Sequence, residues 1–151
     1  MKTEIDLKEL VVGLAGLMSV SGRETHERRK LLSLVGGYFD EYYADDVGNQ
    51  VFVRYCGREN APKILIDTHF DEVGMYVADI KEGGFLSFVN IGGLDTRILN
   101  AAEVIIYGDK QIYGVIASTP PHLQKPEDAE KPGEIHEFLI DTGYTKEELE
   151  G

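Results

Sequence analysis

Short β-type runs separated by glycine-containing turns dominate the sequence after Gly74, and they constrain the fold more than any other feature. Residues 75–80 and 85–90 flank Lys81-Glu82-Gly83-Gly84, while residues 103–107 and 111–117 flank Gly108-Asp109-Lys110. Each arrangement is typical of a β-hairpin. Residues 135–140 predict a further strand, after a proline-rich loop over residues 119–133. Short strands at close spacing favour a small β-barrel or sandwich, so we expect a β-rich, barrel-like domain here.

The first 72 residues show a different pattern. Apolar residues recur at helical spacing over residues 7–18, with Asp6 as a candidate N-cap, and a second helix is predicted over residues 24–35. The period then changes to two, and strands are predicted at residues 41–44, 51–55 and 63–67. Helices packed against a sheet indicate an α/β domain. We therefore expect two domains, residues 1–72 and 73–151.

Composition excludes several classes of partner. The 151 residues carry a net charge of −12, which disfavours nucleic acid and anionic membranes because phosphates are repelled. The apolar run over residues 10–20 is too short to span a bilayer, and the first residues lack the pattern of a signal peptide. Cys56 is the single cysteine, so a reducing compartment is the simplest interpretation. We expect a cytoplasmic protein.

One stretch carries recognisable chemistry. The apolar run Ile64-Leu65-Ile66 leads into His69, Asp71 and Gly74. A histidine at a strand end can give a metal a neutral nitrogen, and an acid two residues later can fix the orientation of its ring. A structural histidine and a turn-forming acid are the alternative interpretation. One His-x-Asp pair cannot build a catalytic metal centre, because a catalytic zinc needs about three protein ligands.

Other candidate motifs are weak. The adjacent acids Glu147 and Glu148 follow Thr145 and are typical of a capped helix start. The glycine pairs fit neither a phosphate-binding loop nor a dinucleotide fingerprint. Ser118 and His122 form no arrangement that a sequence alone certifies as a catalytic triad.

A series of motifs in a fixed order resembles the N-terminal part of the dinuclear metal aminopeptidases known as glutamyl, deblocking or tetrahedral aminopeptidases and cellulase M. The matching segments are Ser21-Gly22-x-Glu24, Asp46-Val47-Gly48-Asn49, Thr68-His69-Phe70-Asp71-Glu72-Val73-Gly74, Ile91-Gly92-Gly93-Leu94-Asp95, Gly114-Val115-Ile116, Pro120-Pro121-His122 and Ile140-Asp141-Thr142-Gly143. Each motif alone is weak, but their order is specific and covers nearly the whole chain.

The resemblance implies a fold and a chemistry. It implies an α/β metallopeptidase domain, incomplete in residues 1–72, followed by a β-rich, barrel-like dimerisation domain that lacks its last strand. It further implies hydrolysis of N-terminal residues from peptides with two divalent metals, zinc or cobalt. His69 would be a metal ligand, and Asp71 would be the catalytic-site acid that orients it.

The same resemblance sets an expectation about this chain. The remaining ligands and the catalytic glutamate lie in the second half of family members, so we expect a truncated homologue that binds no metal stably and is inactive by itself. Self-association as a dimer or larger species is expected from the β-rich part. Two alternatives are a non-catalytic self-association or peptide-binding module and an endoglucanase-like protein.

Overall fold

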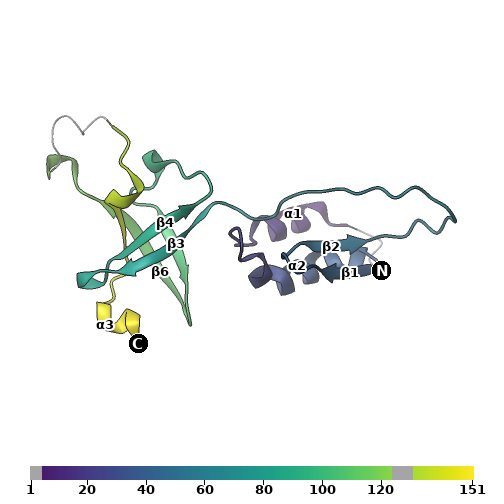
Figure 1. Ribbon diagram of the computed structural model, residues 1–151, viewed down its shortest axis with the longest axis horizontal. Helices are drawn as coiled ribbons and strands as arrows, with labels where there is room; N and C mark the ends of the chain where they lie inside the picture. Colours follow the sequence, from purple (N-terminus) through teal and green to yellow (C-terminus); the bar gives the residue numbers. More distant parts are fainter. Residues whose placement is uncertain (1–4, 124–130) are drawn as a thin grey trace. The chain divides into compact units, whose positions relative to one another are not determined.

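The computed structural model describes residues 5–123 and 131–151, so part of the predicted loop at 119–133 lies outside the described residues. The chain divides into two compact units, residues 1–72 and 73–151 (Figure 1). Each unit is built from its own elements. No helix in the described part of the chain is long and apolar enough to cross a membrane.

Two helices form one layer of the first unit. Helix α1 spans Leu7–Ala15, and the Asp6 carboxylate caps it by accepting a hydrogen bond from the Glu9 amide at 2.9 Å. Helix α2 spans Arg28–Val35 and is preceded by a 3₁₀ turn at Glu24–Glu27. Both predicted helices are confirmed, although α1 ends three residues early. A Cβ atom on Gly13 would lie 2.6 Å from Leu34 Cδ2, so glycine allows the two helices to approach closely.

A hairpin forms the sheet of this unit. Strand β1, Glu41–Ala44, runs antiparallel to β2, Gln50–Val53. The aromatic ring of Phe52 contacts those of Phe39 and Tyr42, with ring centroids 5.1 and 5.0 Å apart. The prediction for β1 is confirmed in full, and that for β2 is confirmed except that the strand ends at Val53 instead of residue 55.

The predicted third strand at residues 63–67 is wrong. These residues lie in an extended segment that pairs with no strand in the described parts of the chain (Figure 1). Ile64, Leu65 and Ile66 are 84–87% exposed. An apolar run becomes a buried strand only where neighbouring strands satisfy its amide and carbonyl groups. The described residues provide no such neighbours here.

The second unit is a curled, five-stranded antiparallel sheet with the order β3-β4-β7-β6-β5 (Figure 1). Its strands are β3 Gly74–Ile80, β4 Leu86–Ile91, β5 Glu103–Tyr107, β6 Gln111–Ser118 and β7 Phe138–Asp141. The two predicted hairpins are confirmed. The strand predicted at 135–140 is confirmed only from residue 138 onward, because Ile135–Glu137 form a 3₁₀ turn closed by a Glu134–Glu137 capping box.

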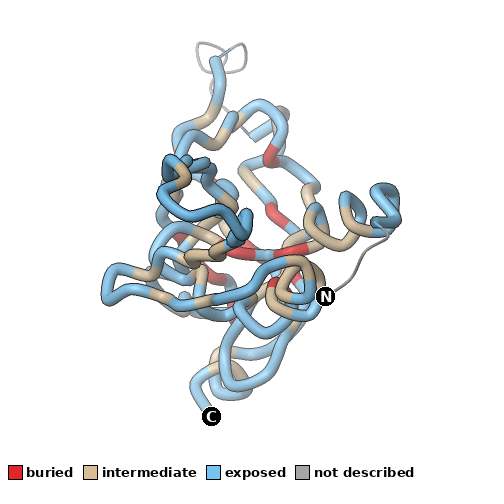
Figure 2. The backbone as a smooth tube through the Cα atoms, turned by 90° about the vertical axis from the view of Figure 1, so that its right-hand side faces the viewer, coloured by how far each residue is buried: buried red, intermediate tan, exposed pale blue. Residues whose placement is uncertain are grey.

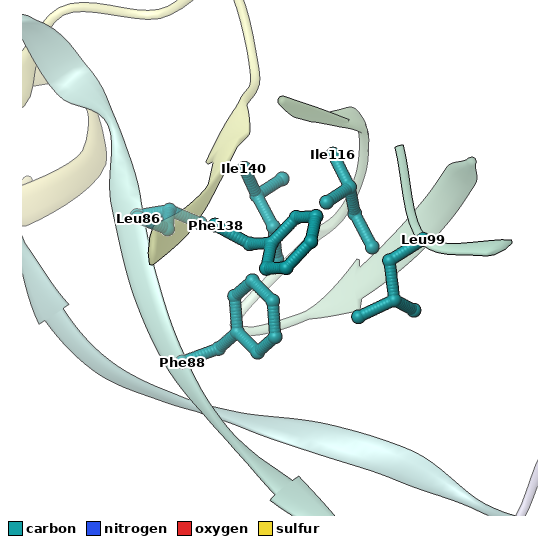
Figure 3. Close-up of a cluster of buried hydrophobic side chains, with 6 residues drawn as sticks. All are labelled: Leu86, Phe88, Leu99, Ile116, Phe138 and Ile140. Carbon is teal, nitrogen blue, oxygen red and sulfur yellow. The ribbon is translucent and has the colours of Figure 1, made fainter. Parts of the chain in front are cut away.

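The core of the second unit lies on one face of this sheet. Its buried side chains come from β4, β6, β7 and the turn before β5: Leu86, Phe88, Leu99, Ile116, Phe138 and Ile140. Figure 3 shows the Phe88 and Phe138 rings turned toward one another beside Ile140. Buried residues are few elsewhere along the tube in Figure 2. Burial of these six side chains is therefore the main source of stability for the unit.

A short C-terminal helix and the tyrosine before its N-cap contact the two hairpin turns. Helix α3, Lys146–Glu150, begins with a capping box in which the Glu148 carboxylate accepts from the Thr145 amide at 2.8 Å. This confirms the structural interpretation of Glu148. Lys146 pairs with Glu82 of the first turn at 3.2 Å. The ammonium group of Lys110, in the second turn, lies 5.6 Å from the centroid of the Tyr144 ring.

Asp95 provides a testable titration. Hydrogen bonds from the Arg97 guanidinium, the shortest at 2.6 Å, and from the Arg97 amide lower the pKa of Asp95 from 3.8 to about 2. Because this pKa is below that of the unfolded chain, the stabilisation by ionised Asp95 is present above pH 3.8 and is lost as the pH falls toward 2. Carboxyl-carbon NMR should find Asp95 ionised at pH 3. Arg97→Gln should raise its pKa, and a wild-type midpoint near 3.8 would contradict the assignment.

Candidate metal-ligand site

His69 and Asp71 lie close together at the end of the extended segment that follows β2. His69 Nδ1 is 3.0 Å from the Asp71 backbone oxygen and 3.2 Å from Asp71 Oδ1. The histidine side chain is 85% exposed, whereas that of Asp71 is 32% exposed. The Asp71 side chain is therefore largely covered by neighbouring residues, while the His69 ring faces solvent.

These contacts determine which ring nitrogen is free. Both atoms near Nδ1 are oxygen acceptors, so Nδ1 must carry the proton and donate. In the neutral imidazole, Nε2 then has an unshared electron pair. A histidine whose Nδ1 donates to a carboxylate while Nε2 stays open has the arrangement found in histidine ligands of metals. His69 thus fits the part of one metal ligand.

A backbone contact that the sequence did not reveal fixes the position of this pair. The Glu72 amide donates to the Ser19 carbonyl at 2.7 Å, and Val20 and Glu72 form an isolated parallel β-bridge. Ser19 is 1% exposed. The sequence marks Ser21-Gly22 as part of a motif but gives no partner for Ser19 and Val20. A β-branched valine between two serines was the one local hint of pairing.

A complete metal site is not assembled within the described residues. Among residues 5–123 and 131–151, no three histidine, cysteine, aspartate or glutamate side chains are grouped so that they could hold a metal ion. His69 supplies one donor, and Asp71 is occupied with the histidine ring. His69 and Asp71 fit one ligand of a metal and its orienting acid.

The other motif residues have structural partners. The Asp141 carboxylate accepts from the Gly143 amide at 2.9 Å, and hydrogen bonds from Thr145 lower the pKa of Glu148. The Ser118 hydroxyl donates to the Asn100 side chain at 3.3 Å. Cys56 is exposed. None of these contacts builds a second candidate centre in the described residues.

Comparison with known protein families identifies the family of this chain. Residues 48–151 match the M42 glutamyl aminopeptidase family. The chain belongs to this M42 family. The resemblance predicted from the motifs is thereby confirmed, and with it the expectation that relatives are aminopeptidases of a metallopeptidase family. FrvX of Escherichia coli is 34% identical over 145 residues, covering 94% of this chain and 40% of FrvX.

Other M42 relatives agree with this assignment. A lysyl aminopeptidase of Pyrococcus furiosus is 31% identical over 144 residues, covering 93% of this chain and 40% of that protein. The chain therefore spans about 40% of the length of these relatives. The TET aminopeptidase of a thaumarchaeote from marine sediment superimposes with a TM-score of 0.84 at 32% identity, over 95% of this chain and 40% of that structure.

Two further solved structures bear on the alternatives. A Thermotoga maritima protein named endoglucanase has a TM-score of 0.71 at 31% identity, over 91% of this chain and 39% of that structure. The TET1 peptidase of Pyrococcus horikoshii has a TM-score of 0.77 at 31% identity, over 95% and 43%. It assembles into a tetrahedron or a large octahedral shell.

Proposed function

We propose that these residues contribute to the metal-dependent hydrolysis of N-terminal residues from peptides, with His69 as a metal ligand and Asp71 as the acid that orients it. The observation that carries the proposal is the contact of His69 Nδ1 with Asp71, which leaves Nε2 open in a chain of the M42 family. We also propose that residues 1–72 carry the ligand while residues 73–151 serve self-association.

The proposed roles follow from the chemistry of the two side chains. A pair of divalent ions, zinc or cobalt, would supply Lewis acidity toward the scissile carbonyl and a more acidic water. Asp71 would keep the proton on His69 Nδ1 and hold the ring in one orientation. The Ser19–Glu72 contact would keep both residues at a fixed place beside the helices. The single Cys56 supports a cytoplasmic location.

The 151 residues by themselves should not hydrolyse amino-acid p-nitroanilides, with or without added zinc or cobalt. The reason is the number of ligands: a catalytic metal needs about three protein donors, and residues 5–123 and 131–151 group no three such side chains. Release of p-nitroaniline measures this directly. Metal-dependent turnover that disappears in His69→Ala would contradict the prediction.

A chimaera tests the function itself. Residues 1–151 would replace the matching part of the Pyrococcus furiosus lysyl aminopeptidase, which this chain resembles over 144 residues. We expect metal-dependent peptidase activity that falls at least about 100-fold in His69→Ala and about 10-fold in Asp71→Asn, in keeping with losses after removal of a ligand's orienting partner. His136→Ala, at an exposed histidine of the second unit, is the matched control. Cleavage of cello-oligosaccharides instead of peptides would favour the endoglucanase alternative.

Self-association is the second proposed property. It is supported by the solved assembly of the Pyrococcus horikoshii relative and by the strand order, in which β3 and β5 are the two edges of the sheet. Unpaired strand edges can pair with another chain. We expect a dimer or larger species in light scattering at micromolar concentration. A monodisperse 16.8 kDa monomer over that range would contradict this proposal.

A further inference from the structure

A groove lies on the outer face of the β5–β6–β7 part of the sheet, opposite the core. Its volume is about 510 Å³, and its walls include Glu103 of β5, Tyr113 and Val115 of β6, and Asp141 of β7. In the strand register, Glu103 is paired with Val115, and Val115 with Asp141. The neighbouring residues Ile116 and Ile140 are 1% and 3% exposed and point into the core. Because side chains alternate along a strand, the three paired residues share the outer face.

The two carboxylates of the groove carry uncompensated charge. No hydrogen bond or ion pair joins the Glu103 carboxylate to another residue in the described part of the chain. Among the described residues, the Asp141 carboxylate accepts a hydrogen bond from the Gly143 amide alone, at its Oδ1 atom. The residues that line the groove are otherwise neutral, so no cation of the groove itself offsets these charges. A ligand that carries positive charge is the complement of this surface.

The lining beside the carboxylates is apolar and aromatic, since Val115 lies between them in the register and Tyr113 is two residues before it on β6. Tyr113 is 69% exposed and Val115 is 44% exposed. The methylenes of an arginine or lysine can lie on such a surface while the charged head reaches a carboxylate. A guanidinium group can also stack on the exposed face of a tyrosine ring. The groove therefore offers both parts of an arginine side chain a suitable contact.

The spacing of the acids indicates how many cations fit. Glu103 and Asp141 are separated by one intervening strand, which places their backbones about 10 Å apart. Val115 lies between the two acids in the register, so two cations, one for each carboxylate, match this spacing. Alternate side chains of an extended peptide are about 6.6 Å apart. Two arginine side chains at such positions are long enough to span the rest of the distance between the two acids.

We propose that this groove binds a short basic segment of a partner polypeptide, in which two cationic side chains at alternate positions contact Glu103 and Asp141 across Val115 and one of them stacks on Tyr113. This binding goes beyond the proposed peptidase function, since it needs neither His69 nor a metal. The proposed ligand of the groove is a basic polypeptide, not a second copy of this chain, which is itself acidic.

The probe is acetyl-Gly-Arg-Val-Arg-Gly-amide, with the citrulline peptide of the same length as its uncharged counterpart. Titration into the labelled 151-residue chain, followed by amide NMR, should shift residues 103, 113–115 and 141–143. Glu103→Gln and Tyr113→Ala should each weaken binding at least about threefold, as expected for an exposed ion pair or cation–π contact. Tyr113→Phe, which keeps the ring, should bind like the wild type.

Asp109→Asn is the matched control. It removes the same charge from the turn of the same hairpin but lies outside the groove. We expect its affinity to stay within about twofold of the wild type. An equal loss in Asp109→Asn would show that the net charge attracts the peptide and would overturn the proposal. So would equal binding of the citrulline peptide, or a Tyr113→Ala variant that changes only the oligomeric state in light scattering.

Discussion

Replacing Gly84 with alanine should destabilise the β-rich unit by about 3 kcal/mol or more. The added Cβ atom would lie 1.8 Å from the Tyr144 carbonyl oxygen and 2.9 Å from its carbon. Neither is a flexible side chain, so the β3–β4 turn and the chain before α3 would have to separate. The backbone at Gly84 also has φ +80°, a conformation that costs an alanine about 1–2 kcal/mol. The loss of unfolding free energy can be measured by urea unfolding, with hydrogen exchange of residues 73–151 as the probe.

Gly83→Ala is the control for this experiment. Gly83 has nearly the same φ, +79°, but the nearest atom to an added Cβ is a Phe85 ring carbon at 3.4 Å. Only the cost of the backbone conformation applies, so the expected loss is about 1 kcal/mol. Equal losses at both glycines would mean that the close approach of Tyr144 to the turn does not matter for stability.

Phe138→Ala should cost about 3–5 kcal/mol, the usual range for removing a buried phenylalanine ring. Phe138 is 4% exposed and lies in the cluster of Figure 3, with Phe88 on one side and Ile140 on the other. Its loss would leave a cavity in the middle of a small core that has few other buried side chains. A domain of this size has a total stability of about 5–15 kcal/mol, so much of the unit would be unfolded in mild denaturant.

The control is Phe85→Ala, which removes the same ring from a position that is 36% exposed in the same unit. Its expected cost is about 1 kcal/mol, since Phe85 lies outside the buried cluster and is already partly in contact with water. Hydrogen exchange should show the effect of Phe138→Ala within residues 73–151, while peptides from residues 1–72 keep wild-type protection. An unchanged midpoint for Phe138→Ala would contradict the assignment of this cluster as the main core.

The features that could be predicted from the sequence are those determined by residues only a few positions apart. The hairpins of the second unit were predictable because a glycine-containing turn and alternating side chains lie within a few residues of each other. The capped starts of α1 and α3 were predictable for the same reason. The prediction of a strand at 63–67 was wrong because an apolar run carries no information on whether partner strands are present. In the described residues this run pairs with no strand.

The candidate site shows the same division. The approach of His69 to Asp71 is a contact between residues two positions apart, so the sequence could predict it. The contact of Glu72 with Ser19 joins residues more than fifty positions apart, and no local pattern specifies it. The groove around Tyr113 is likewise invisible in the sequence, because it depends on which strands become neighbours in the sheet.

The strand order of the second unit also has a consequence during protein synthesis. β7 follows the other four described strands in the sequence, but it lies in the middle of their sheet, between β4 and β6. The β3–β4 and β5–β6 hairpins can therefore leave the ribosome and form before their common partner exists. Until residues 138–141 emerge, each hairpin has an unpaired edge that can capture another nascent chain. Slow translation between residues 118 and 138 should therefore promote misassembly, and pairing of β7 with β4 and β6 should remove these two open edges.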